Sequence, residues 1–309
     1  MRTGHEAVRV TGLWVGFRTG FWGRRFFALQ GMDLGFEKGK AIALIGPNGA
    51  GKSTLIKAML GFLRPTKGSL TILGGSSKEA VLSGKIGYTP ENPGLYPHLG
   101  GLETLMLAGS LLGLNKKTAK AQAMMLIERL GLLGHETREV KGYSKGMQQR
   151  LAIGFSLMGN PKLLIWDEPM SGLDPIGRGV VLNLVSDLKN EGKTLVFSTH
   201  IIPDIQETCD HVVLIDKGKK VSELSPKAFL DESTPGYILK GFGRLVSVGL
   251  RDDVRVLESQ EGSWALEVPK GSLGETMLHL TQAGVSIENM EPIRPSLEKL
   301  LLERLLDHG

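Results

Sequence analysis

A glycine-rich loop that carries a lysine and two hydroxyl residues follows a short apolar run, Ala41–Ile45. The loop consists of Gly46, Pro47, Asn48, Gly49, Ala50, Gly51, Lys52, Ser53 and Thr54. The spacing G-x-x-x-x-G-K-[ST] between a strand and a helix is typical of a phosphate-binding loop, because backbone N–H groups and the helix N-terminus surround the phosphates. We expect Lys52 to reach the β- and γ-phosphates of a nucleoside triphosphate and Ser53 to ligate Mg²⁺. The alternative, a glycine-rich turn without a ligand, is disfavoured by the complete motif in its proper setting.

Two acidic residues, Asp167 and Glu168, end a second apolar run, Leu163–Trp166. A strand end would place Asp167 beside Mg²⁺ and direct Glu168 toward the γ-phosphate, where a carboxylate can act as a base or orient the attacking water. A strand followed by two acids is common by chance. The two acids therefore indicate a nucleotide site only in combination with the motifs around them.

The composition is that of an ordinary globular protein and excludes several other classes. The chain has 309 residues, a formal net charge of +5 and one cysteine, Cys209. A single cysteine excludes an internal disulfide and a zinc cluster of cysteines, and it fits a reducing compartment. The longest stretch of low polarity, 105–114, is shorter than the ~20 apolar residues of a membrane-spanning helix. With no apolar signal region behind the first residues, we expect a cytoplasmic protein.

Strands and helices alternate through the first three quarters of the chain, which predicts a largely parallel α/β sheet. Its expected strands are Ala41–Ile45, Leu163–Trp166, Thr194–Ser198 and His211–Ile215. The segment 8–37, rich in glycine and aromatic residues, predicts antiparallel strands. Apolar residues at helical spacing in 101–133 predict a helical insert, so that a helical subdomain spans about 101–160.

The pattern changes near residue 230. Beyond it we expect strands at 245–250 and 264–268, and helices at 275–283 and 295–306. The chain is therefore expected to form two domains, 1–229 and a small α+β domain, 230–309.

Three further motifs complete an ordered set. They are Tyr143-Ser144-Lys145-Gly146-Met147 at the start of a helix, Ser171-Gly172-Leu173-Asp174, and Ser198-Thr199-His200 at the end of a strand. With these five motifs in this order, the chain resembles the ATP-binding subunit of an ABC transporter from near its N-terminus to about Ser222. The resemblance implies a P-loop NTPase core of the ABC type, with a mostly parallel sheet, an antiparallel β subdomain and a helical subdomain.

The resemblance implies roles for the residues around the bound nucleotide. The loop 46–54 corresponds to the Walker A motif, Asp167 to the Walker B aspartate and Glu168 to the catalytic glutamate. His200 corresponds to the switch histidine that contacts the γ-phosphate, although a lone histidine at a strand end is more often structural. Phe17 is the best match for the aromatic residue that stacks on adenine.

Other residues correspond to positions that act between two subunits. Ser144 and Gly146 match the signature residues that contact the γ-phosphate bound by the opposite subunit, and a plain helix cap at Ser144 is compatible with that role. Asp174 matches the loop that couples the two sites.

Two departures from the commonest pattern point to a subgroup. The signature has Lys145 in place of glycine, and Glu91 stands where the family has a glutamine that ligates Mg²⁺ and water. With Pro295-Ser296-Leu297-Glu298 before a leucine-rich helix, these features resemble subunits that pair with separate permeases of the type-2 exporter kind. A glutamate at position 91 can also ligate Mg²⁺ and water, so Glu91 is a candidate metal ligand and catalytic residue.

The resemblance implies a motor subunit in which two copies enclose two ATP molecules and drive a separate integral-membrane permease, for export, from the cytoplasmic face of the membrane. The alternatives are a non-transport ABC ATPase that acts on nucleic acid or ribosomes, and a regulatory ATP-binding module. The mixture of arginines and aromatics in 17–27 could contact nucleic acid, but a hairpin with inward aromatics is favoured, and we expect no nucleic-acid partner.

Overall fold

The computed structural model describes residues 5–19, 24–199, 208–226, 234–243, 245, 250–260 and 262–293. The chain forms two compact units, Met1–Pro226 and Lys227–Gly309. The boundary expected from the sequence, between residues 229 and 230, lies close to this division. Each unit is described by itself.

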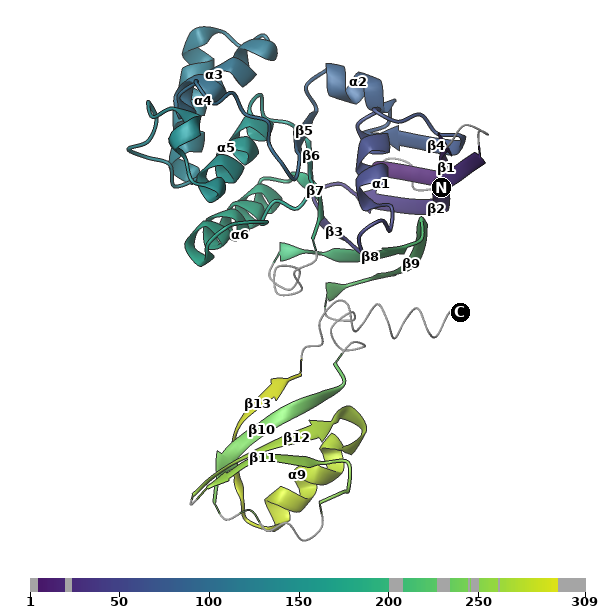
Figure 1. Cartoon of the computed structure of the whole chain (residues 1–309), viewed down its shortest axis with the longest axis vertical. Coiled ribbons are helices and arrows are strands. Elements are labelled where there is room, and N and C mark those ends of the chain that lie inside the picture. Colours follow the sequence, from purple (N-terminus) through teal and green to yellow (C-terminus); the bar gives the residue numbers. More distant parts are fainter. Residues whose placement is uncertain are drawn as a thin grey trace. The chain divides into compact units, whose positions relative to one another are not determined.

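A six-stranded sheet forms the centre of the first unit (Figure 1). Its strands, in spatial order, are β5 (Ile86–Thr89), β6 (Leu163–Trp166), β7 (Thr194–Ser198), β3 (Ala41–Ile45), β8 (His211–Asp216) and β9 (Lys219–Leu224). The first five strands are parallel, and β9 returns antiparallel to β8. Strands β3, β6 and β7 are buried along their whole length, as their uniformly apolar sequences predict. Because the strands are parallel, their carboxyl ends, and the loops that follow them, meet at one edge.

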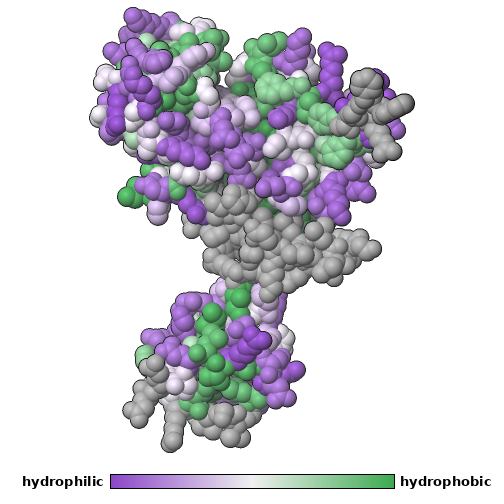
Figure 2. All heavy atoms as spheres, viewed as in Figure 1, coloured by the Kyte–Doolittle hydropathy of each residue, from purple (hydrophilic) through white to green (hydrophobic). Residues whose placement is uncertain are grey.

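A three-stranded antiparallel sheet lies beside this edge in the order β2 (Arg24–Glu37), β1 (Glu6–Thr19) and β4 (Lys67–Ile72). Helix α1 (Lys52–Met59) packs on β2 and β4 and buries Leu55 and Met59 completely. One apolar cluster joins this sheet, α1 and the central strands. In Figure 2 hydrophilic side chains cover most of the visible face of the unit.

Helices cover the other side of the unit. The expected helical segment contains α3 (Gly101–Leu111), α4 (Lys116–Arg129) and α5 (Lys145–Leu157), which pack on one another. Helix α6 (Pro175–Asn190) packs on α5 and β7, and the short α2 (Ser77–Leu82) precedes β5. Figure 1 draws α1 and α5 on opposite sides of strands β5–β7.

The second unit is a four-stranded antiparallel sheet with one described α-helix, which agrees with an α+β composition. The strands, in spatial order, are β11 (Arg255–Gln260), β12 (Ser263–Pro269), β10 (Gly236–Phe242) and β13 (Ser286–Pro292), and the helix is α9 (Leu273–Gln282). Leu239, Trp264 and Leu280 belong to its core.

Two expectations for this unit are not met or not described. The strand expected at 245–250 is absent at its two described ends, Leu245 and Leu250, which pack against the core as loop residues. Residues 246–249 and the helix expected at 295–306 lie outside the described residues.

Candidate active site

The loop 46–54 joins β3 to α1 and requires glycine at particular positions. Gly46 has φ +153° and Gly51 has φ +113°. A Cβ atom on Gly46 would lie 2.1 Å from the carbonyl oxygen of Ile215, and one on Gly51 would lie 2.9 Å from the carbonyl oxygen of Ala28. A Cβ atom on Gly49, with φ +81°, would meet no atom of the described residues within 4 Å. The outer glycines therefore allow close packing against the protein, while Gly49 leaves the middle of the loop open for a ligand.

A turn between β8 and β9 supports this loop from beneath. The Gly218 N–H donates to the carbonyl oxygen of Ala50 at 2.8 Å, and the Gly218 carbonyl accepts from the Gln30 N–H at 2.8 Å. Gln30 Nε2 also donates to the Lys217 carbonyl. The turn thus links the phosphate loop to β2. This contact cannot be predicted from the residues of the loop alone.

Lys52 is the first residue of α1, and its side chain is 8% exposed. Its ammonium donates to the carbonyl oxygens of Gly46 at 2.7 Å and Pro47 at 3.2 Å. Burial lowers the pKa of Lys52, while the nearby carboxylates of Glu168, Asp167 and Glu91 act to raise that pKa.

The structure therefore brings Lys52 near three of the four acids that the sequence singled out, namely Asp167, Glu168 and Glu91. The acids act on the charge of Lys52 from two different strand ends, because Asp167 and Glu168 follow β6 and Glu91 follows β5. A cation among carboxylates at the carboxyl edge of a parallel sheet is suited to hold phosphate oxygens and a divalent metal.

Asp167 and Glu168 differ in how they are held. Asp167 is 8% exposed, and its Oδ1 accepts a hydrogen bond from Ser198 Oγ at 2.6 Å. Glu168 has φ +49°, which is uncommon for a residue with a side chain, and its backbone N–H donates to the same Ser198 Oγ at 2.8 Å. From the sequence, Ser198 is only the start of the motif that ends in His200.

The residues present fit a magnesium ion. Ser53 is exposed in the first turn of α1, and Asp167 has a second carboxylate oxygen, Oδ2, beside the one that Ser198 contacts. Hydroxyl and carboxylate oxygens are the ligands that Mg²⁺ prefers, usually together with waters and phosphate oxygens. Glu91 is exposed on the loop after β5 and is a further oxygen donor near Lys52.

Ser144, Gly146 and Asp174 form a second group, which lies with the helices. Ser144 caps α5, and its Oγ accepts from the Met147 N–H at 3.2 Å. Asp174 caps α6 by accepting from the Gly177 N–H at 3.0 Å. A Cβ atom on Gly146 would lie 3.4 Å from Leu173, next to Asp174, so the two motifs are neighbours. Because α5 and α1 lie on opposite sides of β5–β7, one chain carries this group apart from Lys52 (Figure 1).

Phe17 is the remaining predicted contact. It lies on β1 directly opposite Phe26 of β2, and the two residues are 37% and 58% exposed. Phe27 instead packs edge-on against Trp14, with 5.2 Å between ring centroids. The exposed aromatic pair is therefore available for stacking, whereas Phe27 is not. His200 lies outside the described residues.

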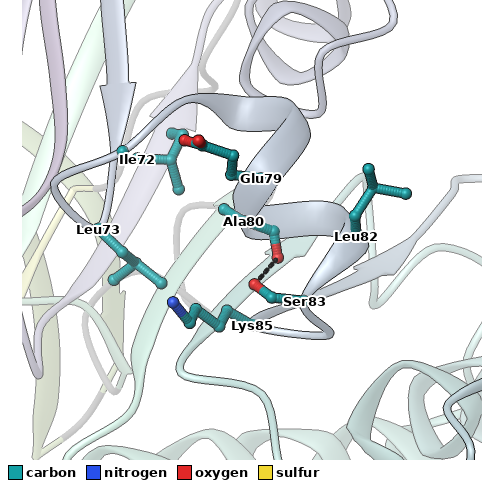
Figure 3. Close-up of a pocket in the computed structure, with 8 residues that line it drawn as sticks. Ile72, Leu73, Glu79, Ala80, Leu82, Ser83 and Lys85 are labelled. Carbon is teal, nitrogen blue, oxygen red and sulfur yellow. Dashed lines mark hydrogen bonds between the residues drawn. The ribbon is translucent and has the colours of Figure 1, made fainter.

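A hollow of about 510 Å³ beside α2 contains none of these residues (Figure 3). Two of its polar side chains serve the ends of α2. The Glu79 carboxylate accepts from the Ser76 N–H at 2.9 Å, and Ser83 Oγ donates to the Ala80 carbonyl at 3.3 Å. These polar side chains of the hollow therefore stabilise the ends of the short helix α2. The loop 46–54 and the ends of β5 and β6 remain the candidate site.

Comparison with known proteins connects this geometry with one family. A family model described as "ABC transporter" matches residues 29–171. An uncharacterized ABC transporter ATP-binding protein of Synechocystis sp. is 32% identical over 95% of this chain and 83% of its own length. The lantibiotic transport ATP-binding protein SrtF of Streptococcus pyogenes is 38% identical over 63% of this chain and 83% of its own length. Among solved structures, cbiO1 from Clostridium perfringens, part of the ABC transporter complex cbiONQ, superposes with a TM-score of 0.65 and 25% identity, covering 74% of this chain and 92% of cbiO1.

Proposed function

We propose that this chain is the motor subunit of a transport system and works as a pair of copies around two ATP molecules. The chain belongs to the family of ABC transporter ATP-binding proteins and is an ATPase. The observation that carries the proposal is the division of the site residues into two groups. Lys52 and its three acids lie at the edge of the sheet, while Ser144 and Gly146 lie with the helices on the other side of β5–β7. Two copies in a two-fold arrangement would place the second group of one copy against the first group of the other.

The residues of one copy would divide the work of hydrolysis. Lys52 would hold the β- and γ-phosphates, and the backbone of the loop 46–54 would surround them. Ser53 and Asp167, with Glu91 as a further candidate, would hold Mg²⁺, which neutralises charge on the phosphate oxygens. Glu168 would accept a proton from the attacking water or orient it. In the proposal His200 contacts the γ-phosphate, as the family resemblance implies.

The contributions from the second copy would complete the site. Ser144 would donate its hydroxyl to the γ-phosphate bound by the partner, and Asp174 would couple the two sites because its loop contacts Gly146. Phe17 of the copy that holds the nucleotide would stack on the adenine ring. Closure on ATP and reopening after hydrolysis would then provide the mechanical stroke.

A separate permease would receive this stroke at the membrane. No helix among the residues that the structure describes is long and apolar enough to cross a membrane. The names of SrtF, a transport ATP-binding protein, and of cbiO1, part of a larger transporter complex, support an arrangement with separate subunits. We propose a location on the cytoplasmic face of the membrane and, from the type-2 exporter resemblance, export as the direction.

The residues from about 230 onward would form an accessory or regulatory domain. Every described residue of the proposed site lies in the unit Met1–Pro226. The second unit has its own sheet and core, as expected for a domain that folds around separate contacts.

Dimerisation tests the proposal. In Glu168→Gln, ATP should bind without being hydrolysed, so light scattering should detect a monomer or weak dimer without nucleotide and a stable dimer with ATP. Adding Ser144→Arg should prevent dimerisation while ATP binding stays within about threefold, since in the proposal Ser144 contacts only the nucleotide bound by the partner copy. Ser110→Arg is the matched control, because Ser110 is also an exposed serine on the helical side. A Glu168→Gln chain that stays monomeric in ATP, or a Ser144→Arg variant that dimerises as well as Ser110→Arg, would contradict the two-copy arrangement.

A further inference from the structure

Ser198 occupies the point where the three functional strands meet. Strand β7, which ends at Ser198, lies between β6 and β3. The register pairs Ser198 with Leu44 of β3, and it pairs Phe197 with Trp166 of β6. The next step along β6 is Asp167, so Ser198 stands beside the acid pair on one side and beside the strand that leads into the phosphate loop on the other. Its side chain is completely buried.

One hydroxyl group at this point serves both acidic residues. Ser198 Oγ donates its proton to Asp167 Oδ1 at 2.6 Å and accepts the backbone N–H of Glu168 at 2.8 Å. A serine hydroxyl has one donor and two acceptor positions, so this arrangement uses the donor fully. The first bond fixes the rotation of the Asp167 carboxylate, and the second fixes the backbone from which the Glu168 side chain projects.

The backbone held in this way is an unusual one. Glu168 has φ +49°, in the left-handed region that residues with a Cβ atom normally avoid. A turn follows at once, because the Ser171 N–H donates to the Glu168 carbonyl oxygen at 3.0 Å. A non-glycine residue keeps such a conformation only where its surroundings impose it, and such residues gather at functional sites.

We infer that Ser198 is a positioning residue for ATP hydrolysis, which sets the direction of the Glu168 side chain and the orientation of the Asp167 carboxylate through a single hydroxyl. This inference rests on the proposed role of Glu168 as the base. It predicts that Ser198 affects the chemical step more than the binding of nucleotide, because Lys52 and the loop 46–54 hold the phosphates from a different strand end.

The simpler interpretation is that Ser198 merely satisfies buried polar groups, and the same chain offers a matched case for comparison. Ser156 is 5% exposed, donates to the Ile153 carbonyl at 2.7 Å and accepts from Trp166 Nε1 at 3.0 Å. It therefore anchors β6 one residue before Asp167, again with one donated and one accepted hydrogen bond, but these bonds go to neither acid. If burial alone mattered, Ser156→Ala and Ser198→Ala would lower turnover alike.

The test measures steady-state ATPase activity, nucleotide affinity and melting temperature for the full chain. Ser198→Ala should lower kcat about 10–100-fold, the usual effect of removing a partner that orients an active-site ligand. The affinity for ATP in EDTA should stay within about threefold. Ser156→Ala should lower the melting temperature to a similar degree but keep kcat within about threefold. Ser198→Thr, which keeps the hydroxyl, should recover most of the lost kcat, and it serves as the informative variant should Ser198→Ala fail to fold.

A double-mutant cycle separates this inference from the proposed function. If Ser198 acts through Glu168, then Ser198→Ala should add less than about threefold to the defect of Glu168→Gln. A Glu168→Gln variant that keeps more than about a tenth of the parent kcat would overturn the role of Glu168 itself. If Glu168→Gln is inactive while Ser198→Ala keeps kcat within threefold, or if Ser156→Ala is as slow as Ser198→Ala, only the positioning role of Ser198 is wrong.

Discussion

The turn beneath the phosphate loop should be intolerant of a single methyl group. Gly218 has φ +77°, and a Cβ atom there would lie 2.4 Å from the carbonyl oxygen of Ala28 and 3.1 Å from the Cα atom of Leu29. Both neighbours are backbone atoms, so the strand or the turn must move. Gly192 provides a matched control, since it has the same φ of +77° but, within the part of the chain that the structure describes, no atom lies within 4 Å of the position that a methyl group would take.

The two alanine variants should differ by a calculable amount. A left-handed alanine costs about 1–2 kcal/mol, and this is the whole effect expected at Gly192. At Gly218 the displacement also weakens the bonds to Ala50 and Gln30, each worth about 1 kcal/mol, which brings the loss to about 3–4 kcal/mol. For a unit of this size 1 kcal/mol corresponds to about 2–4 °C. Gly192→Ala should therefore melt about 4 °C lower than the parent and Gly218→Ala about 10 °C lower.

ATP binding should separate the variants further. Gly218 holds the carbonyl of Ala50, so a displacement of Gly218 leaves the phosphate loop less ordered. ATP must then order this loop when it binds, and this cost should weaken ATP affinity about five- to tenfold. Gly192→Ala should bind ATP like the parent. Melting by circular dichroism and titration calorimetry measure both quantities. Equal melting temperatures for the two variants, or unchanged ATP affinity in Gly218→Ala, would refute the supporting role of the turn.

Four other substitutions test the site directly. Lys52→Ala should abolish ATP binding and turnover together, as calorimetry and phosphate release can show, whereas Glu168→Gln should bind ATP and lose about 10²–10⁴-fold in hydrolysis. Glu91→Gln should change turnover only a few fold, because Glu91 lies on an exposed loop. If Glu168→Gln instead keeps substantial activity, and the double variant with Glu91→Gln loses it, the two acids share the role of the base. Phe17→Ala should weaken ATP binding about tenfold through lost stacking, measured by fluorescence titration, and an equal or larger loss in Phe26→Ala with none in Phe17→Ala would assign the stacking to Phe26.

Local motifs and short apolar strands can be predicted from the sequence because their signals lie within a few residues. The bounds of β3, β6 and β7 agree with the structure, since each is a short apolar run buried on both faces. Strand β4 is not predicted, because most of its side chains are exposed and it shows no apolar alternation. Helix α6 is not predicted either, since Gly177 and Gly179 interrupt its helical propensity, although Asp174 and Pro175 form a clear start signal.

The candidate site shows the same limit. Lys52, Asp167, Glu168 and Glu91 are found from their own motifs, and the structure brings them together. The hydrogen bonds of Ser198 to the acid pair depend on the register between β6 and β7. The support of the phosphate loop by the turn at Gly218 depends on the pairing of β8 and β9. Register and long-range pairing are properties of the assembled sheet, so no spacing within a motif reveals them.

The position of β3 in the sheet has a consequence for the synthesis of this protein on the ribosome. Strand β3 ends at Ile45, but its two neighbours, β7 and β8, begin only at Thr194 and His211. A nascent chain therefore carries a short, fully apolar central strand that stays without sheet partners while most of the first unit is synthesised. The phosphate loop that follows β3 cannot take its final shape before the turn at Gly218 has emerged. Nucleotide can then assist only the last stage of folding, and a fragment that stops before His211 would lack β8 and leave an edge of β3 open to aggregation.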